Sequence, residues 1–119
     1  MVSAAELISK LDFLDTETAL VYFGNMAELY AETVSMYVRD RYDAELQRLF
    51  DAEDWPSYQR TAHSIKSTSN LIGAADMFEK AKSLELAAKA NDIDFVRANH
   101  DSVMKDYKEL LSRIEAALA

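Results

Sequence analysis

Apolar side chains recur along this chain with the spacing of helices rather than of strands. Between residues 26 and 38 they follow the i, i+3, i+4, i+7 pattern of one helix face. A second stripe of the same kind runs from residue 95 to residue 114. Only 2 Gly and 1 Pro punctuate the sequence, too few for a sandwich or barrel with a turn every 8–12 residues or so. The pattern predicts amphipathic helices around a shared core.

Capping residues divide the first half of the chain into short helices. Ser3 to Glu6 has the form of a capping box that opens a short helix to about Leu11. Asp15 and Thr16 provide a second cap, ahead of residues 19–23. Asn25 is expected to cap the helix over residues 26–38, and polar residues 39–41 to interrupt it before residues 44–50.

The second half of the chain predicts three longer helices. Asp54, Trp55 and Pro56 form the clearest helix start, since Pro in the first turn loses no hydrogen bond. This helix should reach Leu71-Ile72 and stop at Gly73, and the next should cover residues 75 to about 90. Either Asp92 or Asp94 then caps a final helix that ends near Ala119.

Short connections between amphipathic helices predict antiparallel neighbours. With no internal repeat and no Ser/Gly/Pro linker, residues 1–119 are expected to form a single domain. The predicted fold is all-α: an antiparallel up-down four-helix bundle with one or two additional short N-terminal helices.

Composition excludes several classes of function. The chain has 13 Lys+Arg against 21 Asp+Glu, a formal net charge of −8, which argues against a nucleic-acid partner. Without Cys there is no disulfide and no Cys-based zinc site. No apolar run approaches the ~20 residues of a membrane span, and no basic apolar leader follows Met1, so we expect no membrane insertion and a cytoplasmic location.

The predicted helix over residues 56–72 has an unusual polar sector. On a helical wheel of about 100° per residue, Trp55, Tyr58, Ala62, Ile65, Ser69 and Ile72 form the core stripe. A neighbouring sector is entirely polar and contains Gln59, His63, Lys66, Ser67 and Asn70. His63 should therefore point away from the core.

The same region is free of acidic residues. No carboxylate occurs between Asp54 and Asp76, whereas Arg60 and Lys66 lie within this stretch. A neutral imidazole is a nucleophile near neutral pH, and a phosphoryl group on it adds about two negative charges that a Lys three residues on can pair with. If His63 accepts a phosphoryl group, the absence of nearby carboxylates favours that chemistry, and the small Ser67 leaves room for a partner.

Other interpretations of His63 stay open on the wheel alone. It could be a surface histidine without a role on an amphipathic helix. A buried core histidine fits the polar sector poorly. A metal ligand is disfavoured because the positions one turn away are Gln59 and Ser67, and no Cys is available. We expect no metal site.

Residues 61–74, Thr-Ala-His-Ser-Ile-Lys-Ser-Thr-Ser-Asn-Leu-Ile-Gly-Ala, resemble the signature of histidine-containing phosphotransfer (HPt) domains. In that pattern a phosphorylatable His precedes Leu or Ile, then Lys, then Gly or Ser, with Gly-Ala a few residues later. Leu84-Glu85 resembles the Leu-Glu of the family's following helix, and residues 15–30 resemble its opening helices. The resemblance covers about residues 12–115.

The resemblance implies a four-helix bundle with His63 as an exposed phosphoacceptor and Lys66 as the phosphate charge partner. It implies that Ser67 permits close docking and that Gly73 makes the turn to the next helix. Some members carry Gln where this chain has Glu85, so a carboxylate there could orient the imidazole or face elsewhere.

The implied partners are response-regulator receiver domains, a hybrid histidine kinase, or both. Such a chain has no cofactor of its own, and the receiver supplies the phosphorylated Asp and Mg²⁺. With 2 Gly the sequence cannot form a Gly-rich phosphate loop, so we expect a phosphocarrier and not an enzyme with kinase activity.

The alternative functions are a helical adaptor that binds a receiver or another protein without phosphotransfer, and a phosphoacceptor module cut from a larger kinase. We expect a monomer. Docking is expected to use apolar residues that flank His63, with Leu71, Leu11, Phe13 and Leu14 as candidates.

Overall fold

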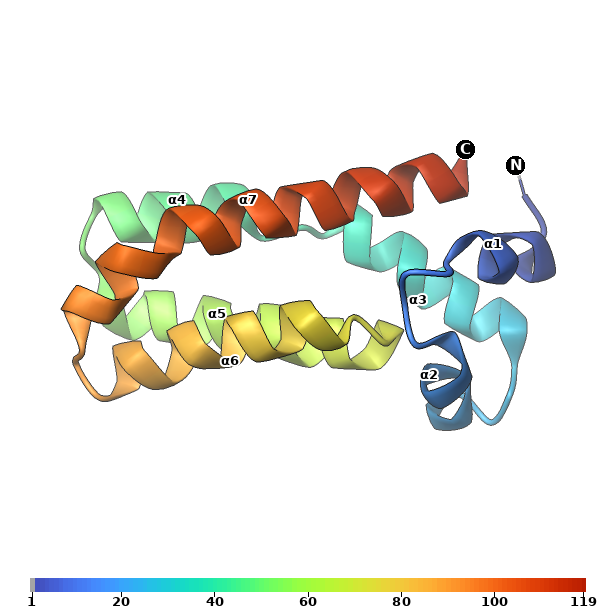
Figure 1. The fold of residues 1–119 in the computed structure, drawn as a ribbon, viewed down its shortest axis with the longest axis horizontal. Helices are drawn as coiled ribbons and strands as arrows, with labels where there is room; N and C mark the ends of the chain where they lie inside the picture. Colours follow the sequence, from blue (N-terminus) through green and yellow to red (C-terminus); the bar gives the residue numbers. More distant parts are fainter. Residues whose placement is uncertain (1) are drawn as a thin grey trace.

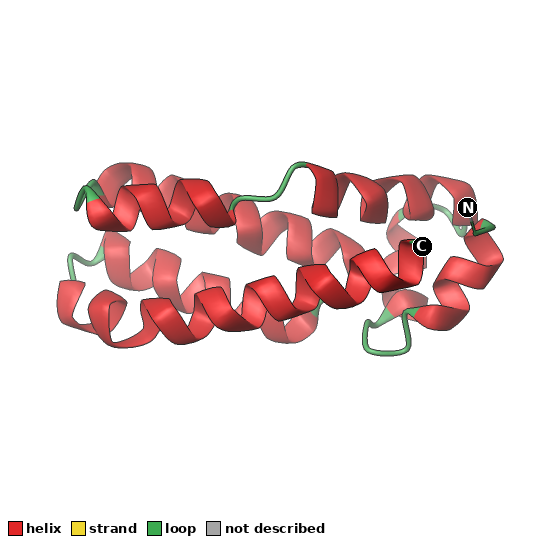
Figure 2. Ribbon diagram, turned by 90° about the horizontal axis from the view of Figure 1, so that it is seen from above, coloured by secondary structure: helices red, strands yellow, loops and turns green. Residues whose placement is uncertain are grey.

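A computed structural model describes residues 2–119, which fold into seven α-helices and no strand (Figures 1 and 2). The helices are α1 (Ala4–Lys10), α2 (Thr16–Tyr22), α3 (Ala27–Arg39), α4 (Asp43–Asp51), α5 (Trp55–Ile72), α6 (Ala75–Lys89) and α7 (Ile93–Leu118). The predicted all-α fold is confirmed. None of these helices is both long and apolar enough to cross a bilayer.

The bundle has four long helical segments. Helices α5, α6 and α7 are three of them, and α3 followed by α4 forms the fourth. Figure 2 shows α3 and α4 end to end along one edge, separated by the expected break after Arg39. Helix α5 packs along α6, α6 along α7, and α4 against both α5 and α7. Helices α5 and α7 therefore lie diagonally across the bundle from each other (Figure 1).

Buried tyrosine hydroxyls link α5 to α3 and to α7 through hydrogen bonds. The Tyr30 hydroxyl donates to the carbonyl of Ile72 at 2.8 Å, and the Tyr37 hydroxyl lies 2.8 Å from the Ser69 hydroxyl. Tyr58 bonds to His100 of α7 at 2.8 Å. Since a buried hydroxyl without a partner is costly, these bonds specify how α3 and α7 are placed along the bundle relative to α5.

Four of the predicted caps are present. Ser3, Asp15, Asp54 and Asp92 each accept a hydrogen bond from a backbone N–H of the first turn. The predicted cap at Asn25 is wrong. Met26 precedes α3 without a side-chain bond, because Asn25 has a left-handed backbone (φ +60°) that makes the turn after α2.

Helices α1 and α2 cover one end of the bundle and are attached to it at Gly73. The N–H of Asp15 donates to the Gly73 carbonyl at 2.9 Å, and Gly73 ends α5 with a left-handed φ of +82°. Leu11 and Leu14 are buried in the core, so their predicted role in docking is wrong. Both side chains pack between the first two helices and the rest of the bundle instead of facing solvent.

Candidate phosphotransfer site

Helix α5 holds a polar surface on a rigid support. The Asp54 carboxylate accepts from the Ser57 N–H at 3.3 Å, and Gly73 closes the other end. Its core face is buried as the wheel predicts, through Tyr58, Ala62, Ile65, Ser69 and Ile72, with Trp55 half-buried. His63 lies midway along the helix on the other side, and 56% of its side chain is exposed.

The imidazole of His63 is held from one side by Glu85 of α6. Its Nδ1 lies 2.5 Å from Glu85 Oε2. A carboxylate can only accept a hydrogen bond, so Nδ1 carries the proton and donates it to Glu85. In the neutral imidazole the unshared electron pair is then on Nε2, on the far side of the ring.

Glu85 also binds Lys66, the cation one turn after His63. Lys66 Nζ lies 2.6 Å from Glu85 Oε1, so one carboxylate contacts both residues. The Glu85 side chain is only 11% exposed, whereas the Lys66 side chain is 22% exposed. Burial on its own raises the pKa of Glu85, but the hydrogen bonds from Lys66 and His63 outweigh burial and hold that pKa below its ordinary value. Glu85 is therefore ionised at neutral pH.

The expectation that no anion lies near His63 is wrong at this position. The sequence excludes carboxylates along α5, but α6 packs against α5 and brings in Glu85 from 22 residues downstream. A wheel of a single helix contains no information about side chains that the next helix contributes. The bound Lys66 offsets the added negative charge.

The remaining sequence candidates are distributed around His63 as follows. Ser67 and Asn70 are exposed, Gln59 is half-buried, and Gly73 lies at the turn between α5 and α6. Leu71 is 41% exposed and borders a groove of about 200 Å³ between α3 and α5, which Met36 and Thr68 also line. Apolar side chains thus border the polar surface that contains His63.

The second histidine of the chain, His100, has a different environment. It is fully buried, stacks on Phe50 with ring centroids 3.8 Å apart, and bonds through Nε2 to Gln47 at 2.9 Å. Its Nδ1 accepts from the Tyr58 hydroxyl. Burial lowers the pKa of His100, so it is a neutral core residue without access for a phosphoryl donor.

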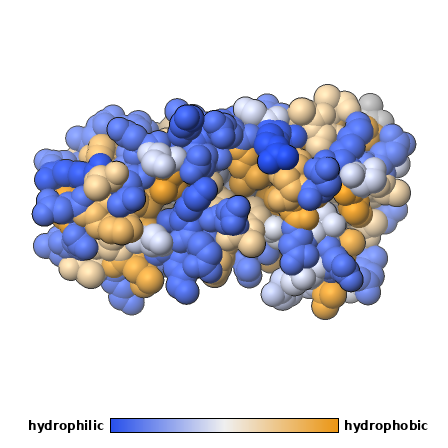
Figure 3. Space-filling model, viewed as in Figure 1, coloured by the Kyte–Doolittle hydropathy of each residue, from blue (hydrophilic) through white to orange (hydrophobic). Residues whose placement is uncertain are grey.

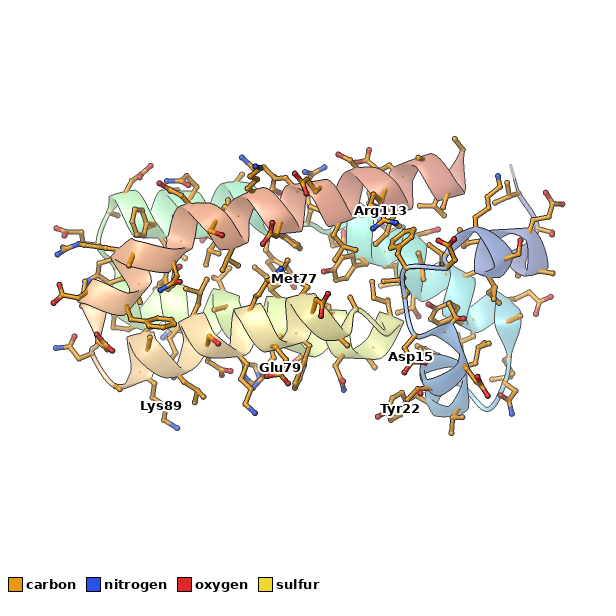
Figure 4. The ribbon with its side chains drawn as sticks, viewed as in Figure 1. Asp15, Tyr22, Met77, Glu79, Lys89 and Arg113 are labelled. Atoms are coloured by element: carbon orange, nitrogen blue, oxygen red, sulfur yellow. The ribbon has the colours of Figure 1, made fainter. Side chains whose placement is uncertain are left out.

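A large cavity lies apart from His63. Its volume is about 500 Å³, and it lies between the α1–α2 connection, α6 and α7, where Figure 4 labels Asp15, Met77 and Arg113. Neither His63 nor Glu85 lines it. Figure 3 shows mostly polar residues on this side of the molecule, with smaller apolar patches between them. Across residues 2–119 no cluster of His, Cys, Asp and Glu could hold a metal ion.

Comparison with known families gives one match. A family model described as Hpt domain matches residues 26–118, which covers most of the chain and includes His63, Lys66 and Glu85. No curated protein and no solved structure matches.

Proposed function

The chain belongs to the Hpt domain family, whose members carry out histidine phosphotransfer in phosphorelays, and we propose that His63 is its phosphoacceptor. The observation that carries this proposal is the orientation of an exposed imidazole by a carboxylate. Glu85 binds Nδ1, so in the neutral ring the unshared electron pair is on Nε2, on the side away from Glu85. A nucleophile needs this combination of a fixed ring and an available electron pair.

The transfer step follows from this arrangement. The electron pair on Nε2 attacks the phosphorus of an aspartyl phosphate on the partner, so an N–P bond forms while the P–O bond to the aspartate breaks. The aspartate leaves as a carboxylate, and the proton on Nδ1 remains in its hydrogen bond with Glu85. Reversal of the step would pass the phosphoryl group to a second aspartate.

Lys66 has two roles in this proposal. It offsets the charge of Glu85, so that the group orienting His63 repels an incoming phosphoryl group less. An ammonium has three donors, and those not directed at Glu85 can bind phosphoryl oxygens once His63 is modified. Gln59, Ser67 and Asn70 form the polar rim, where the small Ser67 allows close approach of the partner.

The partners proposed for this surface are receiver domains of response regulators, a hybrid histidine kinase, or both. The Mg²⁺ ion would be bound by the receiver, where it stabilises the charge of the transferring group. We propose that this chain acts as a cytoplasmic monomer and as a phosphocarrier without kinase activity of its own.

The test is transfer of label from a receiver domain. A panel of receiver domains is phosphorylated with ³²P-acetyl phosphate, freed of the donor and mixed with the protein. We expect acid-labile, base-stable label on the wild type and none on His63→Gln. Buried His100 is the internal control, and label there would contradict the site assignment.

The alternative function, an adaptor that binds receivers without accepting phosphate, gives a different result. A receiver would then bind the protein and keep its label. Unlabelled wild-type protein in a stable complex with a receiver would favour that function over phosphotransfer.

A further inference from the structure

The two cations of α5 differ in what they contact. Lys66 is bound to Glu85. Arg60, which lies one turn before His63, is exposed, and its Nη2 donates to the Ser57 hydroxyl at 2.9 Å. Among the described residues no carboxylate oxygen lies within 4.0 Å of the Arg60 guanidinium.

Among the described residues, Arg60 is the one arginine with neither a carboxylate nor an aromatic ring as its partner. Four of the others form ion pairs with carboxylates, and the fifth lies over an aromatic ring: Arg39 with Asp40, Arg41 with Asp43 and Glu115, Arg48 with Glu45, Arg97 with Glu53, and Arg113 above Phe13. A chain with eight more acidic than basic residues thus leaves one arginine without a carboxylate or aromatic partner. That arginine lies on the helix that carries His63.

Arg60 gives helix α5 an exposed positive charge that no carboxylate neutralises. Glu85 and Lys66 cancel each other at 2.6 Å, and α5 itself carries no acidic residue. The guanidinium of Arg60 is then the remaining charge of α5 itself. It belongs to a residue for which no contact with the imidazole or with Glu85 is found among the described residues.

The direction of the Arg60 side chain indicates how it could act. Side chains on a helix tilt toward its N-terminus, and the bond to Ser57 shows that Arg60 does so. Its guanidinium therefore extends away from His63 along the exposed face. In this orientation the guanidinium does not reach a phosphoryl group on His63, but it can contact a protein that covers His63.

We infer that Arg60 is a docking residue that recognises the acidic rim of the protein that exchanges phosphate with His63. This inference rests on the proposed function. A site that binds Mg²⁺ and carries an aspartyl phosphate is built from carboxylates, so its rim is negatively charged. An exposed arginine beside the nucleophile complements that charge, accelerates association and fixes the orientation of the complex.

The expected effect is on association and not on the transfer step. Rim charges change the association rate and its salt dependence. An exposed ion pair is worth about 0.2–1 kcal/mol, which is up to about fivefold in affinity, and reversing the charge adds repulsion. We expect Arg60→Glu to raise the half-saturating receiver concentration about tenfold at low salt, and Arg60→Lys to change it less than threefold.

The experiment measures phosphotransfer from the receiver that labels the wild type fastest, over a range of receiver and NaCl concentrations. Arg60→Glu should leave the rate at saturating receiver unchanged and flatten the decrease of the transfer rate with salt. Lys105→Glu is the matched control, since it makes the same charge change at an exposed position of α7, diagonally across the bundle.

Three results would overturn the docking role: an unchanged concentration dependence in Arg60→Glu, a loss confined to the rate at saturation, or an equal effect of Lys105→Glu. Absence of label from the wild type would instead refute the proposed function, so the two failures are distinguishable. Thermal melts of each variant show whether it is folded.

Discussion

The close contact between Gly73 and Asp15 gives the most specific prediction, on the effect of replacing Gly73 by Ala. The second glycine of the chain, Gly24, is the matched control. Both glycines have left-handed backbones, with φ of +60° at Gly24 and +82° at Gly73. A Cβ at Gly24 would meet no atom within 4 Å. A Cβ at Gly73 would collide with the backbone carbonyl of Asp15, whose carbon would be 2.8 Å away. The two Gly→Ala variants therefore share the backbone strain and differ in the collision.

The magnitudes follow from these two contributions. An alanine in the left-handed region costs about 1 kcal/mol. Displacing the Asp15 backbone adds about 1–3 kcal/mol of overpacking and weakens the bond from Asp15 to Gly73. We expect a loss of about 1 kcal/mol in the free energy of unfolding for Gly24→Ala and about 3 kcal/mol for Gly73→Ala.

Thermal unfolding followed by circular dichroism checks this difference. An unfolding entropy of about 2.1 cal/mol/K per residue over 119 residues makes 1 kcal/mol equal to about 4 °C in Tm. Tm should fall by about 4 °C in Gly24→Ala and by about 12 °C in Gly73→Ala. Equal shifts in the two variants would refute the close contact between Gly73 and Asp15.

Three further predictions concern the site and the core. Glu85→Gln keeps an oxygen that accepts from His63 Nδ1, so its single-turnover rate of phosphotransfer should stay within about tenfold of wild type. Glu85→Ala releases the ring and unpairs Lys66, so its rate should fall about 100-fold. Equal losses in the two variants would contradict the orienting role of Glu85. Leu71→Ala should raise the half-saturating receiver concentration without lowering Tm, because Leu71 is 41% exposed; a lower Tm would contradict a surface role. Burial lowers the pKa of His100 in the folded protein below the ordinary histidine value of 6.5, so at pH values below about 6.5 the unfolded chain binds more protons than the folded one. The free energy of unfolding should therefore fall as pH decreases from about 6.5 to 5. In urea titrations His100→Phe should remove this pH dependence, and an unchanged slope would contradict the explanation.

Local signals in the sequence were sufficient for most of the fold. The caps at Asp15, Asp54 and Asp92 and the stop at Gly73 depend on side chains within a few residues of the helix ends, so the sequence reveals them directly. The predicted cap at Asn25 is wrong because Asn is favoured both as a helix cap and in left-handed turns. In this structure Gly24 and Asn25 together make a left-handed turn after α2, and α3 begins without a side-chain cap.

Contacts between helices could not be predicted in the same way. The sequence places His63 and Lys66 on one face of α5, since that depends on a single helix. The position of Glu85 depends on how α6 is rotated and shifted against α5, which the packing of the whole core determines. The burial of Leu11 and Leu14 likewise depends on how the first two helices fold back over the bundle. The Leu84-Glu85 pair was the signal that could identify Glu85, but it did not give the direction of the side chain.

The attachment of α1 and α2 shows that the hydrophobic core extends beyond the residues that the family model matches. The family match begins at residue 26, yet Leu7, Leu11 and Leu14 complete the same core, and Phe23 packs edge-on against Tyr30 at 5.8 Å. A truncation designed on the family boundary would retain every residue of the proposed phosphotransfer site and still expose a hydrophobic surface of α3 and α7 to water. Dissection of this protein into smaller active pieces should therefore begin upstream of Ser3.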